Sequence, residues 1–193
     1  YKRVCPFMAA FTSALFGSIR GRTNRKLRFA LAPLEMAAVQ MMRILLILTA
    51  VEGMAFTRSF QSFTLREHRH TWVLEYDASL TAIAILWFRM VGDVEVGVEY
   101  CVVNIESLGL NGMEDRSKFM NFAEFLAATL AVRGLIGQGV TNQPVMVRGD
   151  NKAALTWATK KSFRSEFASR TAMVHIIQNV RAGIEIVVKE HLP

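Results

Sequence analysis

The chain has 193 residues, of which 52% are hydrophobic, 20% are charged and only 4 are proline. This composition supports one sizeable core, or one domain with a smaller appendage, and excludes long disordered segments. The net charge is +7, and it is not evenly spread. Residues 1–70 contain 11 Lys and Arg against 3 acidic residues, a net charge of +8. This basic segment suits either a polyanionic partner or a solvated basic surface.

Membrane and secretion signals are weak. The richest apolar stretch, residues 30–56, is interrupted by charged residues, and its clean core at 44–51 falls short of the ~20 residues that span a bilayer. The apolar run at 7–16 follows basic residues, but no small-residue cleavage site comes after it. We therefore expect no membrane segment and an intracellular protein, in cytoplasm or nucleus, that is not secreted. Cys5 and Cys101 have no ligand-spaced partner, so a zinc site is not expected.

The first predicted element is a helix. Residues 1–28 show no strong period and end in a basic cluster, whereas apolar residues at helical spacing predict a helix over 33–50, with Pro33 in its first turn. Because the sequence begins at Tyr1 and ends just after an apolar run, we also expect a fragment of a longer polyprotein or a degraded copy.

A predominantly β region follows. Residues 72–77 alternate in a strand-like manner, 82–88 predict a second strand, and 94–105, after the turn residues Gly92 and Asp93, predict a third. Three consecutive strands indicate an antiparallel meander.

The remainder alternates between helix and strand. We expect a helix over 119–132, ended by the glycines at 134, 137 and 139, then a strand at 144–148, helices at 151–159 and 165–182, and a final strand at 184–189. The order β-β-β-α-β-α-α-β predicts an α/β fold, with a mixed sheet flanked by helices.

Three acidic residues are candidates for a functional site. Asp77 lies in an apolar strand, where a carboxylate is costly unless it is paired, metal-bound or on a face open to water. Glu124 shares a helical face with alanines that could approach a sheet, or it could belong to a capping box with Asn121. Asp150 follows a strand and opens a helix, so it could simply be an N-cap.

Together the three acids suggest a metal site. If the first and fourth strands are neighbours, Asp77 and Asp150 lie side by side and Glu124 faces them from the helix. Clustered carboxylates are hard oxygen ligands that select Mg²⁺ or Mn²⁺. Two such ions could activate a water and stabilise the leaving oxygen of a phosphodiester.

Several motifs resemble the ribonuclease H domain of retroelement reverse transcriptases. Asp-Ala-Ser at 77–79 resembles its first-strand motif, Gly-Asp-Asn-Lys-Ala-Ala-Leu-Thr-Trp at 149–157 its third-acid segment, and Val-Lys-Glu-His at 188–191 the residues before its last acid. The resemblance covers residues 72–193. Residues 1–70 are similar in placement to the connection between polymerase and nuclease domains in tyrosine-recombinase-type and related retrotransposons.

The resemblance implies a ribonuclease H-like fold with a helical N-terminal appendage, divided into a basic, partly helical connection at 1–70 and a nuclease domain at 71–193 that is truncated before its last helix. Asp77, Glu124 and Asp150 would bind two Mg²⁺ (or Mn²⁺) ions, and His191 would assist proton transfer or product release. The substrate would be the RNA strand of an RNA–DNA hybrid, and a polymerase domain of the same polyprotein would be a partner.

The resemblance also leaves alternatives. The family's fourth acid would follow Pro193 by several residues, so we expect weak or absent cleavage by these 193 residues compared with a chain extended past that acid. A catalytically inactive scaffold or nucleic-acid-binding remnant stays open. An integrase would place its third acid as a Glu on a later helix, and a proofreading exonuclease would have Asp-x-Glu on the first strand. His191 could instead be an ordinary exposed histidine.

Overall fold

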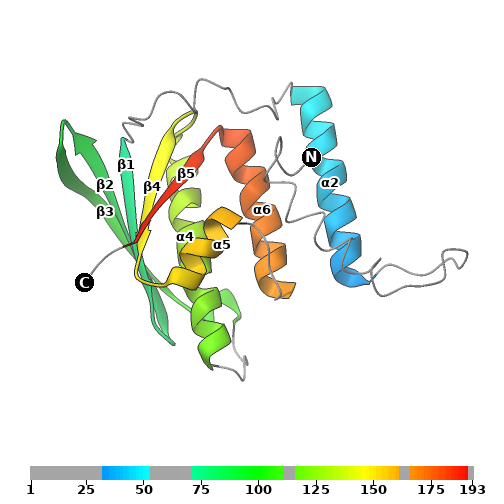
Figure 1. The fold of residues 1–193 in the computed structure, drawn as a ribbon, viewed down its shortest axis with the longest axis horizontal. Helices are drawn as coiled ribbons and strands as arrows, with labels where there is room; N and C mark the ends of the chain where they lie inside the picture. The colour runs from blue at the N-terminus through cyan, green and yellow to red at the C-terminus, as the bar shows by residue number, and fades with distance from the viewer. Residues whose placement is uncertain (1–31, 53–70, 111–115, 161–165, 191–193) are drawn as a thin grey trace, which may run out of the picture. The chain divides into compact units, whose positions relative to one another are not determined.

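The computed structural model describes residues 32–52, 71–110, 116–160 and 166–190 (Figure 1). Their elements follow the predicted order, preceded by one helix: α2 (Pro33–Glu52), β1 (Trp72–Ala78), β2 (Ala82–Val91), β3 (Val94–Asn104), the 3-10 turn η2 (Glu106–Leu108), α4 (Arg116–Gly137), β4 (Pro144–Gly149), α5 (Lys152–Lys160), α6 (Glu166–Ala182) and β5 (Glu185–Glu190).

The five strands form one mixed sheet in the order β3-β2-β1-β4-β5. β1 pairs antiparallel with β2, and β2 with β3, through a hairpin in which Gly92 adopts a positive φ of 63°. β4 pairs parallel with both β1 and β5. The structure thus confirms the expected fold class, a three-strand antiparallel meander extended by parallel strands and flanked by helices.

The register of β1 against β4 positions two of the acids. Glu75 is paired with Arg148, and Asp77 and Asp150 each follow two residues later. Because the two strands are parallel, their carboxyl ends meet at one edge of the sheet, at the bottom of the sheet in Figure 1. The first and fourth strands are therefore neighbours, which was the condition for bringing Asp77 and Asp150 together.

Helix α4 is longer than the sequence pattern predicted. It extends from Arg116 to Gly137, so Gly134 lies inside the helix and does not end it. The reason is a close approach to β2: a Cβ at Gly134 would lie 2.7 Å from Cζ2 of Trp87. The indole Nε1 of Trp87 also donates a hydrogen bond to the carbonyl oxygen of Ala131, at 3.0 Å. Glycine at 134 is thus a packing requirement.

The alanine face of α4 packs on the sheet, as its spacing predicted. α4 contacts mainly β1 and β2. By length and hydropathy α4 could cross a membrane, but 61% of its most apolar window is buried, as in a core helix. The sheet core is formed by buried residues of the strands and of α4, including Leu74, Tyr76, Ile83, Ile85, Trp87, Ala123, Ala127, Ala128, Ala131, Val132, Leu135, Val145 and Val147.

The chain divides into two compact units. One contains the sheet, α4 and α5. The other contains α2 and most of α6, with a small core of Ala38, Leu45, Met173 and Ile176. At the start of α2, a carboxylate oxygen of Glu35 accepts a hydrogen bond from the backbone N–H of Ala32, at 2.9 Å, which satisfies one donor of the helix N-terminus.

Candidate metal centre

Asp77, Glu124 and Asp150 come together at the carboxyl ends of β1 and β4. Each offers one carboxylate oxygen, and these oxygens lie within 4.8 Å of one another. Within the described ranges this is the one cluster of three or more His, Cys, Asp or Glu side chains that could hold a metal ion. The structure therefore brings together the three acids that the sequence singled out.

Glu124 reaches the cluster from the buried side. It is 4% exposed, and its Oε1 accepts a hydrogen bond from the backbone N–H of Ala78, at 3.2 Å. Its Oε2 is buried and has no hydrogen-bond partner among the described residues. Because α4 begins at Arg116, Glu124 lies two turns inside the helix. The capping-box alternative with Asn121 is therefore wrong.

The surroundings of Glu124 favour its protonated form. Burial raises the pKa of Glu124 from 4.5 to about 7, and the charges of Asp150 and Asp77 contribute to the increase. The hydrogen bond from Ala78 opposes the increase only partly. A buried carboxylate beside two others is unfavourable unless a cation or a proton compensates its charge.

Asp150 is not the N-cap of α5. The helix begins at Lys152, and the residue before it, Asn151, accepts a hydrogen bond from the backbone N–H of Ala154 through Oδ1, at 3.0 Å. This is the geometry of an N-cap side chain with the third residue of its helix. Because Asn151 performs the capping, the exposed carboxylate of Asp150 is available to the cluster.

Asn151 also connects the cluster's two supporting elements. Its Nδ2 donates a hydrogen bond to Oδ1 of Asn121 on α4, at 3.0 Å. Asn121 lies three residues before Glu124 and therefore on the same side of the helix. The two amides hold α4 close to the start of α5, and so hold Glu124 close to Asp150. Asn121 and Asn151 are the supporting residues that sequence reasoning missed, although each lies beside or near a predicted acid.

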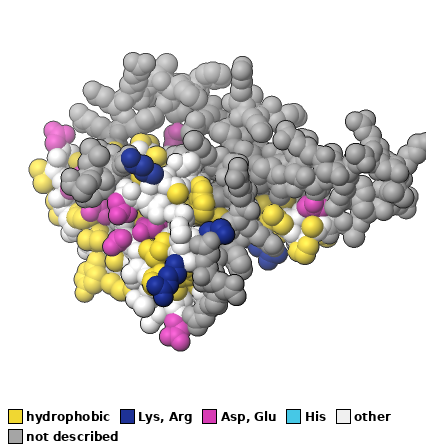
Figure 2. Space-filling model, turned by 60° about the horizontal axis from the view of Figure 1, so that its bottom comes forward, with side chains coloured by type: hydrophobic (Ala, Val, Ile, Leu, Met, Phe, Trp, Pro, Cys, Tyr) yellow, Lys and Arg dark blue, Asp and Glu magenta, His cyan; other side chains and the backbone are white. Residues whose placement is uncertain are grey.

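A cavity of about 250 Å³ opens beside the exposed carboxylates. Arg148 lies in its wall and forms ion pairs with Glu75, at 3.2 Å, and with Glu95. Among the described residues, no cation is paired with Asp77 or Asp150. Figure 2 shows acidic side chains gathered beside hydrophobic ones on the face that carries the strand ends. The cavity is lined by Glu75, Tyr76, Asp77, Leu86, Arg148, Gly149 and Asp150.

The donor set fits a hard divalent cation. It consists of carboxylate oxygens, the preferred ligands of Mg²⁺ and Mn²⁺. Glu124 has one buried oxygen, Oε2, with no partner among the described residues, so its carboxylate has an oxygen free to bind a cation. A cation would offset the mutual repulsion of the three carboxylates and the cost of burying Glu124.

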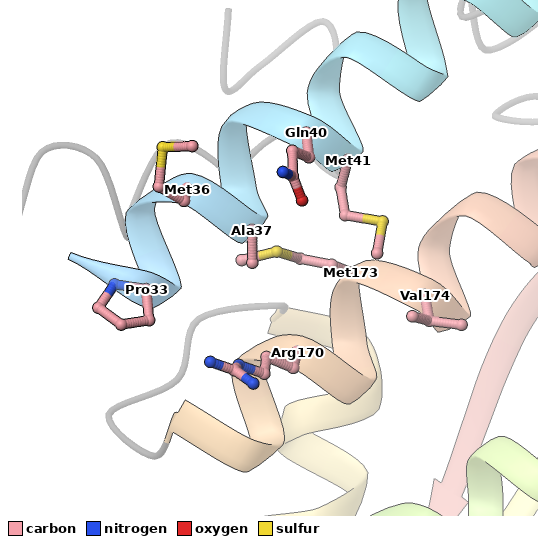
Figure 3. Close-up of a pocket in the computed structure, with 8 residues that line it drawn as sticks. All are labelled: Pro33, Met36, Ala37, Gln40, Met41, Arg170, Met173 and Val174. Atoms are coloured by element: carbon pink, nitrogen blue, oxygen red, sulfur yellow. The ribbon is translucent and has the colours of Figure 1, made fainter. Parts of the chain in front are cut away.

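His191 lies outside the described residues, so its predicted role is untested. A cavity of about 350 Å³ between α2 and α6 is lined mainly by methionines and other apolar side chains, with Arg170 and Gln40 as its polar groups (Figure 3). Such a lining is typical of a packing groove. Cys101 is a free cysteine, as expected, and is partly buried.

No family model matches the chain, and the search of curated proteins found no relative. Among solved structures, the chain is similar to ribonuclease H1 from the halophilic archaeon Halobacterium salinarum NRC-1. The two share 14% sequence identity over 62% of this chain and 84% of that chain, with a TM-score of 0.39. The likeness is remote, so the fold class of this chain rests on its own strand order.

Proposed function

We propose that the chain is a divalent-metal-dependent endonuclease of the ribonuclease H type, which cleaves the RNA strand of RNA–DNA hybrids. The observation that carries this proposal is the convergence of three carboxylates from β1, α4 and the end of β4 to within 4.8 Å. The order and spacing of the motifs at 77–79, 149–157 and 188–191 support the choice of substrate.

The ligands would be Asp77, Glu124 and Asp150, with two Mg²⁺ or Mn²⁺ ions as the proposed complement. Bound divalent ions would supply an acidified water and charge neutralisation for phosphodiester cleavage. Asp77 and Asp150 line the cavity and are exposed, so they are accessible to a polyanionic substrate. Glu124 anchors the cluster from the protein interior, where Ala78 fixes one of its oxygens.

The wider context is also a proposal. We infer a retrotransposon reverse transcriptase as the parent, with a polymerase domain as partner, an intracellular location, and a division at residue 70 between connection and nuclease domain. The net charge of +8 over residues 1–70 supports contact with nucleic acid. His191 would assist proton transfer or product release, which follows from the motif at 188–191 alone.

Cleavage of a labelled RNA–DNA hybrid in Mn²⁺, by a chain extended past the expected fourth acid, tests the function. We expect cleavage of the RNA strand, and a decrease of more than roughly a hundredfold in Asp150→Asn, because loss of a ligand should exceed the effect of losing an outer hydrogen bond. Asp93→Asn is the matched control, since Asp93 is an exposed acid in the β2–β3 turn. Equal rates in the wild type and Asp150→Asn would contradict the assignment.

The inactive alternative predicts a different result. A folded chain that binds Mn²⁺ and hybrid but leaves the RNA strand intact would be a nucleic-acid-binding remnant. Filter binding of the uncleaved hybrid, run beside the cleavage assay, distinguishes this outcome from a chain that does not recognise hybrid at all.

A further inference from the structure

Tyr76 lines the cavity that opens beside the carboxylate cluster. It precedes Asp77 on β1 and is 4% exposed. A Cβ at Gly149 would lie 2.6 Å from both Cζ and Oη of Tyr76, so the phenol ring end lies directly against the backbone of that glycine. The hydroxyl is thereby held beside the residue that precedes Asp150, and only glycine at 149 leaves room for it.

The hydroxyl of Tyr76 has no hydrogen-bond partner among the described residues. Leaving such a group buried and unpaired is unfavourable, and a phenylalanine would fill the same space without that cost. Oε2 of Glu124, in the same cluster, is buried and unpaired as well. The site therefore contains an unpaired donor and an unpaired acceptor.

The cavity connects Tyr76 with the ligands, because Asp77 and Asp150 line it as well. A phenol hydroxyl keeps its proton at neutral pH, because the ordinary pKa of tyrosine is about 10, so it can serve as a donor.

We propose that Tyr76 is a positioning residue of the metal centre, whose hydroxyl donates a hydrogen bond to a carboxylate oxygen of Glu124 or Asp150 and fixes that carboxylate when a cation binds. The proposal rests on the proposed function, because it needs the cluster to bind metal. Its physical reason is that ligating carboxylates are oriented by hydrogen bonds from outside the ligand set. The cost of the unpaired hydroxyl would then be recovered in the loaded site.

Tyr76→Phe removes only the hydroxyl and tests the proposal in the full chain. We expect the metal-free protein to be as stable as the wild type or more stable, and its affinity for Mn²⁺, measured by calorimetry, to decrease about tenfold. A purely structural role would instead lower stability and leave the affinity unchanged. Tyr100→Phe is the matched control, because Tyr100 is 77% exposed on β3.

The possible outcomes separate this inference from the function on which it rests. Wild-type protein that fails to bind Mn²⁺ would overturn both. Wild-type and Tyr76→Phe proteins that bind Mn²⁺ equally would overturn the role of Tyr76 alone.

If Tyr76→Phe does not fold, the unmodified chain provides the test. Proton NMR should then show the Tyr76 hydroxyl exchanging more slowly with water after Mg²⁺ is added. An unchanged exchange rate would contradict the proposal.

Discussion

The carboxylate cluster has a buried side and an exposed side. Glu124 reaches it from within the protein and is 4% exposed, whereas Asp77 and Asp150 are exposed at the ends of neighbouring strands. All three oxygens nevertheless lie within 4.8 Å of one another. The difference indicates a division of roles, in which the buried ligand carries most of the electrostatic cost and the exposed ligands provide access to substrate.

The buried side should make stability depend on pH. The pKa of Glu124 is about 7 in the folded chain, against an ordinary value of 4.5. Between these values the folded state holds a proton that the unfolded state has lost, so the contribution of Glu124 to stability is present below about pH 4.5 and is lost as the pH rises to about 7. The loss is roughly 3 kcal/mol, at about 1.4 kcal/mol for each pH unit between the two pKa values.

Glu124→Gln should remove this dependence. The free energy of unfolding in urea, measured from pH 4.5 to 8 without metal, should favour the variant increasingly as the pH rises. Asp93→Asn is the control for loss of an acid elsewhere. A constant difference between Glu124→Gln and wild type over this range would contradict the assignment, and so would a wild-type pH dependence that saturating Mg²⁺ does not reduce.

Asn151 supports the exposed side of the cluster, and its substitution should have a smaller effect on stability. Asn151→Ala removes the N-cap of α5 and the hydrogen bond to Asn121, and should cost about 1 kcal/mol of stability. Asn151→Ser retains a capping oxygen but loses the donor to Asn121, so it should be nearly as stable as the wild type and bind Mn²⁺ less tightly. If Ser and Ala destabilise the chain equally, as measured by urea unfolding, the cap is not the source of the effect.

Much of the fold followed from local patterns. Alternation and turn residues predicted the three antiparallel strands, whereas the adjacency of β1 and β4 was only a condition for the site that no local pattern could predict. The extent of α4 could not be predicted in this way. A glycine near the end of a helical pattern normally ends the helix. Here Trp87, 47 positions before Gly134 in the sequence, leaves no room for a side chain at position 134.

The sequence predicted the three acids of the candidate site but not the contacts that support them. Sequence alone could not decide between Asp150 and Asn151 as the cap, because both residue types cap helices well and they are adjacent. The three-dimensional start of α5 decides for Asn151. Likewise, nothing in the pattern of β1 indicates that the hydroxyl of Tyr76 lies against Gly149.

The central claim is that Asp77, Glu124 and Asp150 hold divalent cations. The most direct measurement is a Mn²⁺ titration of the full chain followed by electron paramagnetic resonance, beside an Asp77→Asn, Asp150→Asn double variant. We predict saturable Mn²⁺ binding by the wild type and its loss in the double variant, with both proteins folded. Equal Mn²⁺ binding by the two proteins, or none by a folded wild type, would contradict the claim.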